Sequence, residues 1–510
     1  MSIYRVCHSM LLVLLARQVA AYIPAQPSFY SANEHRMLNY DQPRHRPMRR
    51  EDISPIEPIQ PSRYINYGTY GHPYEQVGRL IEEKEKRTVQ YKKQRNLDDD
   101  IFRPLRIHFD TTDLDRWSLQ STETSQQITY LKSYVLPAMA RIWSSALAVV
   151  PVMGNIKVDY AMCPFSDPGV SASLQPQGVS NADLVLYVSA NSNSCSQSNN
   201  KVLASAFSCQ WDQFERPIAG TMDFCLNAIE LDADHPVVTG LSSNTLSPKE
   251  EKALQLAVDT SVHELAHVLG ITSSDMLYYY DSKTGLPRTP NPKIKDVTCM
   301  NGVKKQMWVP DETTLMEKYN QQGVRTYEVT TPTVRQVARN QFNCQRLSGA
   351  ALENQPTNDD CFGSHWDERY FFTERMSAAQ HGVSQILSSL TLGILLDSGW
   401  YKPDFSVAKN SPFGYGAGCQ FVEEPCIVNG EIQTYGADSF CNVTYSVESG
   451  NFQGKYGCDA THTSIAICDL VDYATLSSDK TPPSPEFQYY PGQSVSFVDD
   501  IYVKYTCCTC

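Results

Sequence analysis

The most regular pattern of hydrophobic and polar positions lies between residues 247 and 270. Hydrophobic side chains recur there at intervals of three or four residues, at Leu254, Val258, Val262, Leu265 and Leu269. This spacing places them on one face of an α-helix. Ser247 is a suitable N-cap, Pro248 fits the first helical position and Glu250 completes a capping box. Gly270 then predicts the end of the helix.

Shorter patterns before this helix indicate strands and a second helix. Residues 105–109 alternate as in a strand, and residues 183–188 form a continuous apolar run typical of a buried strand. We expect a further short strand at residues 225–231 and a helix across residues 126–149. Because strands precede a long helix, the sequence predicts a mixed α/β unit, and we expect the whole chain to belong to the α+β class.

The N-terminus has the pattern of a secretory signal. Arg5 supplies a positive charge, residues 10–16 are apolar, and residues 19–21 fit the small-residue rule for cleavage after Ala21. The alternative is a plain apolar terminus. The apolar run is too short for a transmembrane helix, and no later stretch has the length of a membrane span or the pattern of a lipid-anchor tail. We therefore expect a signal peptide over residues 1–21 and a protein that is secreted, extracellular or at the cell surface.

Residues 22–97 differ from the rest of the chain. They are rich in Pro, Tyr and Arg, contain no cysteine, and carry more basic than acidic residues, whereas the whole chain has a net charge of -13. A basic, cysteine-free segment before an acidic body predicts a pro-segment, and a disordered extension is the alternative. Residues 84–95 are rich in Lys and Arg and are the candidate processing stretch.

Composition narrows the class of protein. With 510 residues, 41% of them hydrophobic, the chain is long enough for several packed units. No cluster of Lys and Arg is large enough to predict a nucleic-acid partner. Of the sixteen cysteines, Cys7 lies in the predicted signal and the other fifteen predict a disulfide framework, although Cys507, Cys508 and Cys510 could instead form a small metal knot. Asn442 opens a glycosylation sequon, as in a secreted surface loop.

The predicted helix carries a metal-binding motif. His263-Glu264-Leu265-Ala266-His267 has the form H-E-x-x-H. Residues four apart in a helix lie about 40° apart around its axis, so both imidazoles project from one face and can share one zinc ion. Glu264 lies beside them and is placed to act as a general base rather than as a ligand. The alternative is a chance combination of common residues on an exposed face.

A zinc site needs a third protein ligand. Short-spaced metzincins place a histidine six residues after the second one, but Ser273 stands there. The remaining downstream candidates are His365, His381 and His462. His365 is the better choice because a methionine, Met376, follows it, as in the metzincin methionine turn, and none follows the other two. An ordinary loop histidine and a methionine that only fills core space are the alternatives.

At this point the sequence resembles leishmanolysin, a family of surface zinc metalloproteases (peptidase family M8) in the metzincin clan. The matching stretches are residues 263–270, 329–338, 343–344, 352–355, 363–366, 390–391 and 396–401, with residues 183–188 and Cys209 upstream. The resemblance covers roughly residues 100–470. The third histidine of that family is delayed by a long insertion.

The resemblance implies one catalytic Zn²⁺ ion and a division of the chain. His263, His267 and His365 would be the zinc ligands, Glu264 the catalytic base and Met376 the methionine turn. An N-terminal catalytic subdomain with the zinc helix would span residues 98–270. A central subdomain with the insertion, third ligand and methionine turn would span residues 271–400, and a cysteine-rich C-terminal domain would span residues 401–510.

These features predict a secreted zinc endopeptidase that hydrolyses internal peptide bonds of proteins or peptides. Residues 225–231 are the expected strand for pairing with an extended substrate. The pro-segment cysteine that caps zinc in many relatives is missing between Ala21 and Cys163, and association with a cell surface would have to occur without an anchor. One alternative is a catalytically silent relative used for adhesion or surface binding, although an intact Glu264 argues against it. Another is a metallopeptidase whose third ligand is a carboxylate from a downstream helix.

Overall fold

The computed structural model describes the central part of the chain and several shorter pieces. The described residues are 101–158, 163, 177–190, 195, 203–229, 248–298, 304–319, 325–353, 361–377, 385–425, 427–428, 431–437, 439–440, 444–445, 456–458, 465–467 and 470–471. The expected signal peptide, pro-segment, processing stretch and sequon lie outside them, as do Ser247, His381, His462 and the last three cysteines.

A four-stranded sheet forms the N-terminal part of the fold. Its strands, in spatial order, are β2 (Ile107–Asp110), β4 (Leu184–Ala190), β6 (Pro217–Phe224) and β5 (Ala204–Trp211). The first three run parallel, and β5 runs antiparallel to β6 at the border of the sheet. The strands predicted at residues 105–109 and 183–188 are therefore present, each shifted toward its C-terminal end.

The helix predicted across residues 126–149 is present with different ends. The helical run comprises α4 (Thr122–Tyr130), a π-helical turn η4 (Leu131–Val135) and α5 (Leu136–Ala146). It begins earlier because the side chain of Ser121 accepts a hydrogen bond from the Thr124 backbone N–H, a standard N-cap. It ends earlier because β3 (Leu147–Val149) pairs with two other short strands, β1 (Arg103–Pro104) and β12 (Lys402–Pro403).

The strand predicted at residues 225–231 is wrong for residues 225–229, the part of it that the structure describes. Strand β6 already ends at Phe224, and a 3-10 turn, η5 (Leu226–Ala228), follows. Cys225 is tied to Cys195 by a disulfide. The side-chain amide of Gln127 donates to the carbonyls of Leu226 and Ile229, at 2.8 and 2.9 Å. These contacts from outside the segment satisfy carbonyls that a strand would give to a neighbour, so the chain turns.

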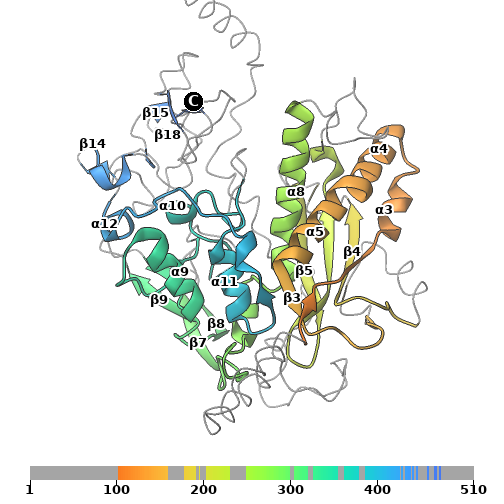
Figure 1. Cartoon of the computed structure of the whole chain (residues 1–510), viewed down its shortest axis with the longest axis horizontal. Coiled ribbons are helices and arrows are strands. Elements are labelled where there is room, and N and C mark those ends of the chain that lie inside the picture. Colours follow the sequence, from red (N-terminus) through yellow and green to blue (C-terminus); the bar gives the residue numbers. More distant parts are fainter. Residues whose placement is uncertain are drawn as a thin grey trace, which may run out of the picture.

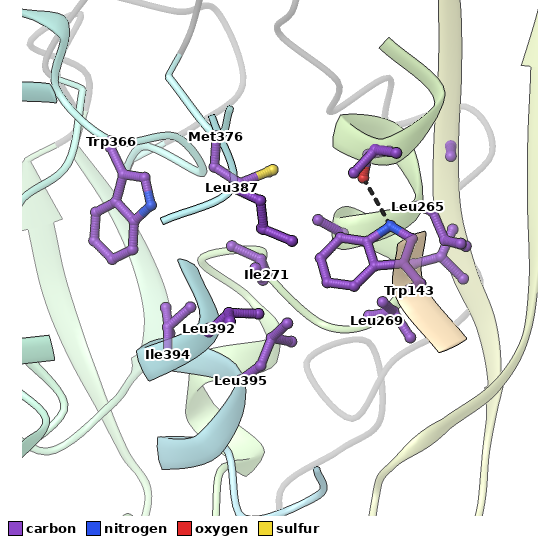
Figure 2. Close-up of a cluster of buried hydrophobic side chains, with 14 of the residues drawn as sticks. Trp143, Leu265, Leu269, Ile271, Trp366, Met376, Leu387, Leu392, Ile394 and Leu395 are labelled. Atoms are coloured by element: carbon purple, nitrogen blue, oxygen red, sulfur yellow. Dashed lines mark hydrogen bonds between the residues drawn. The ribbon is translucent and has the colours of Figure 1, made fainter. Parts of the chain in front are cut away.

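The long helix predicted from the hydrophobic pattern is α8 (Pro248–Val268). Val262, Leu265 and Leu269 are fully buried, and Trp143 of α5 donates its indole N–H to the carbonyl of Val262 (Figure 2). Gly270 ends the helix with a φ of +106°, and a Cβ there would lie 2.6 Å from the Trp400 ring. Only glycine meets both conditions without strain.

The elements after α8 form the other half of the described structure. In Figure 1, α3 to α5 and the four-stranded sheet lie to the right of α8, and α9 to α12 with β7 to β9 lie to its left. Figure 2 shows the core between the halves, where Leu269 and Ile271 lie on the side of Leu387 and the leucines of α11, and Leu265 lies beyond the Trp143 ring, toward the sheet. The helix that carries the H-E-x-x-H motif is therefore shared by both sides of the core.

The remaining elements are short. The helices are α3 (Thr112–Trp117), η6 (Asp275–Tyr278), α9 (Pro332–Phe342), α10 (Glu368–Phe371), α11 (Ser389–Asp397), η7 (Phe405–Val407), α12 (Cys419–Glu423) and η8 (Thr434–Gly436). The strands are β7 (Lys293–Thr298), β8 (Lys304–Val309), β9 (Leu315–Tyr319), β10 (Arg325–Val329), β11 (Ala350–Ala351), β13 (Ile427–Val428), β14 (Glu431–Ile432), β15 (Thr444–Tyr445), β16 (Tyr456–Cys458), β17 (Ile465–Ile467) and β18 (Leu470–Val471).

Disulfides cross-link this α+β fold, as the cysteine content predicts. Three bonds are Cys163–Cys209, Cys195–Cys225 and Cys344–Cys419. The last joins the end of α9 to the start of α12 and so holds part of the region after residue 401 to the centre of the molecule. Among the described residues, no helix has the length and apolarity that a membrane span requires.

Candidate metal centre

Two histidines of α8 lie side by side in the interior of the protein. His263 and His267 are 1% and 3% exposed, and their Nε2 atoms are 3.2 Å apart. They are one helical turn apart on the same face of α8, as the four-residue spacing predicts.

A third histidine reaches them from a segment almost a hundred residues further on. His365 is 2% exposed, and its Nε2 lies 3.1 Å from Nε2 of His267. Its position is set by backbone bonds on both sides, because the N–H of Glu353 donates to the carbonyl of His365 and the N–H of Trp366 donates to the carbonyl of Met376. The structure thus groups His263, His267 and His365 within ligand distance of one another.

Ser273 occupies the place where short-spaced metzincins have their third histidine, and the later segment passes directly beside it. The backbone N–H of Ser273 donates to the hydroxyl oxygen of Ser364 at 3.3 Å. The residue next to Ser364 is His365. His365 therefore lies close in space to Ser273, the position at which short-spaced metzincins have their third histidine.

The hydrogen bonds of the rings determine which nitrogen carries the proton. Nδ1 of His263 donates to the carbonyl of Arg375 at 2.7 Å, and Nδ1 of His267 donates to the carbonyl of Ile271 at 2.8 Å. A carbonyl only accepts, so each Nδ1 holds a hydrogen and each neutral ring has a lone pair on Nε2. Nδ1 of His365 faces Oε1 of Glu353 at 2.6 Å, and a carboxylate fixes the same tautomer.

Protonation of His263 is opposed by its surroundings. Burial lowers the pKa of His263 well below its ordinary value, and the neighbouring His267 and His365 lower it further. Three lone pairs therefore point together with no donor among them. That arrangement is repulsive unless a cation lies between the three nitrogens.

The spacing of the nitrogens fits a small transition-metal ion. Ligands about 2.0–2.1 Å from a tetrahedral metal lie about 3.3–3.4 Å from one another. The two observed separations, 3.2 and 3.1 Å, are close to this value. Two other clusters of metal-ligand residue types occur in the described parts of the chain, but both contain disulfide-bonded cysteines, which offer no thiolate.

Glu264 is buried beside the histidines without a hydrogen-bond partner. Its side chain is fully inaccessible, and neither carboxylate oxygen has a partner of normal geometry among the described residues. Burial raises the pKa of Glu264 well above its ordinary value, and the nearby backbone N–H of Ala206 on β5 offsets this only in part. A buried carboxyl without a partner destabilises the folded state, and such groups cluster at functional sites.

Comparison with known proteins agrees with this geometry. The sequence model of leishmanolysin, peptidase family M8, matches residues 117–509. The chain belongs to the leishmanolysin family. The resemblance drawn from the sequence motifs is thereby confirmed, and membership of a metallopeptidase family implies a bound metal ion.

Relatives within the leishmanolysin family are distant in sequence. A leishmanolysin-like peptidase of Caenorhabditis briggsae is 28% identical over 353 residues, 66% of this chain and 48% of the relative. The leishmanolysin of Leishmania donovani is 26% identical over 371 residues, 72% of this chain and 50% of the relative. A ciliated left-right organizer metallopeptidase of Mus musculus is 29% identical over 315 residues, covering 61% and 37% of the two chains. The chain spans about half the length of the curated relatives it matches.

Met376 lies in the segment that contacts His263 of this leishmanolysin-family site. It is 1% exposed and projects toward Leu387 in the core (Figure 2). The preceding residue, Arg375, supplies the carbonyl that binds Nδ1 of His263. Met376 thus lies one residue from a direct contact with the metal-ligand candidates, and its role as a methionine turn stays a prediction.

Three residues that contact the histidines were not identified from the sequence. Glu353 binds His365, Arg375 binds His263 through its carbonyl, and Ile271 binds His267 in the same way. Glu353 lies in a stretch that carries the family resemblance, but no local pattern marks a carboxylate that contacts a residue twelve positions away. The carbonyl contacts are independent of side-chain type and leave no sequence signal.

Proposed function

We propose that this leishmanolysin-family chain is a zinc-dependent endopeptidase that cleaves internal peptide bonds. The observation that carries the proposal is the convergence of three buried imidazole lone pairs next to a buried, partnerless carboxyl group. His263, His267 and His365 would hold one zinc ion, and Glu264 would be the general base. The metallopeptidase relatives support the same conclusion.

In this proposal the three histidines bind the metal ion and Glu264 transfers protons. A bound zinc ion would supply a Lewis acid that polarises the scissile carbonyl and lowers the pKa of a coordinated water molecule to about 7. The three histidines would be held in the required tautomer by the carbonyls of Arg375 and Ile271 and by Glu353.

Glu264 would take a proton from the attacking water on a carboxylate oxygen and return it to the leaving amine. Its low exposure supports this role, because a carboxyl group deprived of water has a higher pKa and is a stronger base. Neither oxygen has a partner of normal geometry among the described residues, so the group is available to accept the proton. A catalytically silent adhesion protein would have no use for such a group, since its burial lowers stability.

The substrate would lie along β5 rather than along residues 225–231. β5 is the border strand of the sheet, and its residue Ala206 places a backbone N–H near Glu264. An extended peptide that added to this border by main-chain hydrogen bonds would pass the base and the histidines. Recognition through the backbone is suited to an endopeptidase, because every peptide offers the same main-chain groups.

The cellular setting follows from the sequence. We propose that residues 1–21 are a signal peptide and residues 22–97 a pro-segment, and that the mature enzyme acts outside the cell or at its surface. The disulfides support an oxidising compartment. The division into subdomains at residues 98–270, 271–400 and 401–510 is part of the same proposal.

The decisive experiment is cleavage of an internally quenched peptide library by the purified chain. Activity should disappear after treatment with a zinc chelator and return on addition of about one equivalent of Zn²⁺. The products should show cleavage within peptides rather than removal of terminal residues. Cleavage that persists in the fully metal-free protein would contradict the proposal.

A further inference from the structure

A buried ion pair joins the two segments that hold His263. Asp259 lies one turn before His263 on α8, and the guanidinium of Arg375 donates to its carboxylate. The two residues are 3% and 7% exposed. Gln255, one further turn along α8, also donates to Asp259 at 2.8 Å.

Arg375 connects the ligand, the helix and the returning chain. Its carbonyl accepts the hydrogen bond from Nδ1 of His263 at 2.7 Å. Its backbone N–H donates to the carbonyl of Ile386 at 2.8 Å, and its guanidinium donates to the carbonyl of Gln385 at 3.1 Å. The orientation of the His263 ring thus depends on where the backbone of Arg375 is held.

The pair is an inefficient way to stabilise the fold. Burial raises the pKa of Asp259 and lowers that of Arg375, so the interior disfavours the charge on both residues. Nε of Arg375 is buried without a partner among the described residues. Apolar residues often replace such a pair with no loss of stability, so the contact calls for a reason other than stability.

We propose that Asp259 and Arg375 are positioning residues for the metal centre. The ion pair fixes Arg375 against α8, so that the Arg375 carbonyl holds the His263 ring with Nε2 toward His267 and His365. This role rests on the proposed function, because it concerns the ligand set for zinc. A carbonyl cannot be replaced by mutation, but the side chain that anchors it can.

The test replaces the ion pair by apolar residues of similar volume, Asp259→Leu with Arg375→Met. The metal-free variant should be folded, with a melting temperature close to that of wild type, because both members of the pair are removed together and Glu374, which also faces Arg375, keeps its hydrogen bonds to Ser388 and Thr391. Its affinity for Zn²⁺, measured by competition with a chromophoric chelator, should fall about 10- to 100-fold, the usual effect of losing a contact that orients a ligand. The visible absorption spectrum of the Co²⁺-loaded variant should also shift, since that spectrum reports ligand geometry.

A second buried ion pair provides the matched control. Nε of Arg216 lies 3.1 Å from a carboxylate oxygen of Asp212, and both side chains are buried about as deeply as Asp259 and Arg375. Asp212 directly follows β5, at the opposite end of that strand from Ala206. Asp212→Leu with Arg216→Met should leave the zinc affinity and the Co²⁺ spectrum unchanged. Equal loss of zinc affinity in both double variants would show a general effect of the core and would overturn the proposal.

A conservative variant keeps the test decisive if the apolar pair does not fold. Arg375→Lys retains the charge, but its shorter side chain places the ammonium away from the position of Nη2, the one nitrogen from which Arg375 donates to both Asp259 and the Gln385 carbonyl. We expect a loss of zinc affinity smaller than that of the apolar pair. Wild-type affinity in Arg375→Lys, or in a folded apolar pair, would overturn the role of the ion pair.

The same measurements separate this role from the proposed function. If wild-type protein binds zinc but cleaves no peptide, the endopeptidase proposal fails while the affinities still decide the role of the pair. If wild-type protein binds no zinc, both proposals fail. If wild-type protein binds zinc and cleaves peptides, and the ion-pair variants bind Zn²⁺ with the same affinity as wild type, only the positioning role fails.

Discussion

Glu353 accepts a hydrogen bond from Nδ1 of His365 at 2.6 Å. Both side chains are buried, with exposed fractions of 6% and 2%. Nδ1 of each of the other two histidines donates to a backbone carbonyl, whereas Nδ1 of His365 has a carboxylate partner. A carboxylate makes the imidazole a stronger electron donor and fixes the ring more firmly than a carbonyl does. This contact leads to the first prediction.

Glu353→Gln should weaken zinc binding about 10- to 100-fold. The glutamine side chain has the same shape as that of Glu353, but its neutral amide polarises the His365 ring less than a carboxylate does. Zinc affinity by chelator competition is the measurement. Glu328→Gln is the control, since Glu328 pairs with Lys318 and Ser348 instead of a histidine. Unchanged affinity in Glu353→Gln would show that the carboxylate does not tune the metal centre.

Glu264→Gln should separate catalysis from metal binding. The variant should keep its zinc, because Glu264 is not a ligand, and lose peptide cleavage by about 100-fold or more, the scale for a general base. Its metal-free form should be no less stable than wild type, because the substitution removes a buried carboxyl group that has no partner among the described residues. Near-normal turnover with stoichiometric zinc would refute the assigned role.

The identity of the third ligand can be tested with two histidines. His365→Ala should lower zinc content and activity together, since it removes one of three converging nitrogens. His381→Ala, a change outside the described residues, should affect neither. Metal analysis of both purified proteins gives the answer, and zinc lost only from the His381 variant would reverse the choice.

Gly270→Ala should destabilise the metal-free protein through two effects. A left-handed residue with a Cβ costs about 1–2 kcal/mol, and overpacking against a core residue costs about 1–3 kcal/mol more. The φ of +106° and the 2.6 Å approach to Trp400 provide both conditions. The free energy of unfolding from urea titration measures the sum.

Gly154→Ala isolates the backbone effect. Gly154 has a φ of +97°, but a Cβ there would meet no atom within 4 Å. It should therefore show only the cost of about 1–2 kcal/mol for the left-handed conformation. If Gly270→Ala and Gly154→Ala lowered the free energy of unfolding by the same amount, the close approach of Trp400 to residue 270 would have no energetic cost.

The sequence by itself determined the half of the metal centre that lies within one helix. The order of residues along α8 fixes His263, Glu264 and His267 relative to one another, because helical geometry is local and repeats every 3.6 residues. The same local rules predicted the end of the helix at Gly270. Residues 225–231 show the limit of such rules, since a short apolar run does not reveal the disulfide and the Gln127 amide that turn it.

Only the tertiary structure decided what surrounds that helix. In the sequence, the presence of Met376 favoured His365 over the other histidines. The position of His365 next to Ser273, however, depends on backbone hydrogen bonds within residues 352–377. The contacts of Glu353 with His365 and of Arg375 with His263 and Asp259 join residues 12 to 116 positions apart. Such contacts arise from packing of the whole chain, and two of the three carbonyl or carboxylate partners of the histidines are backbone atoms that every residue possesses. That is why the candidate ligands were visible in the sequence and the groups that orient them were not.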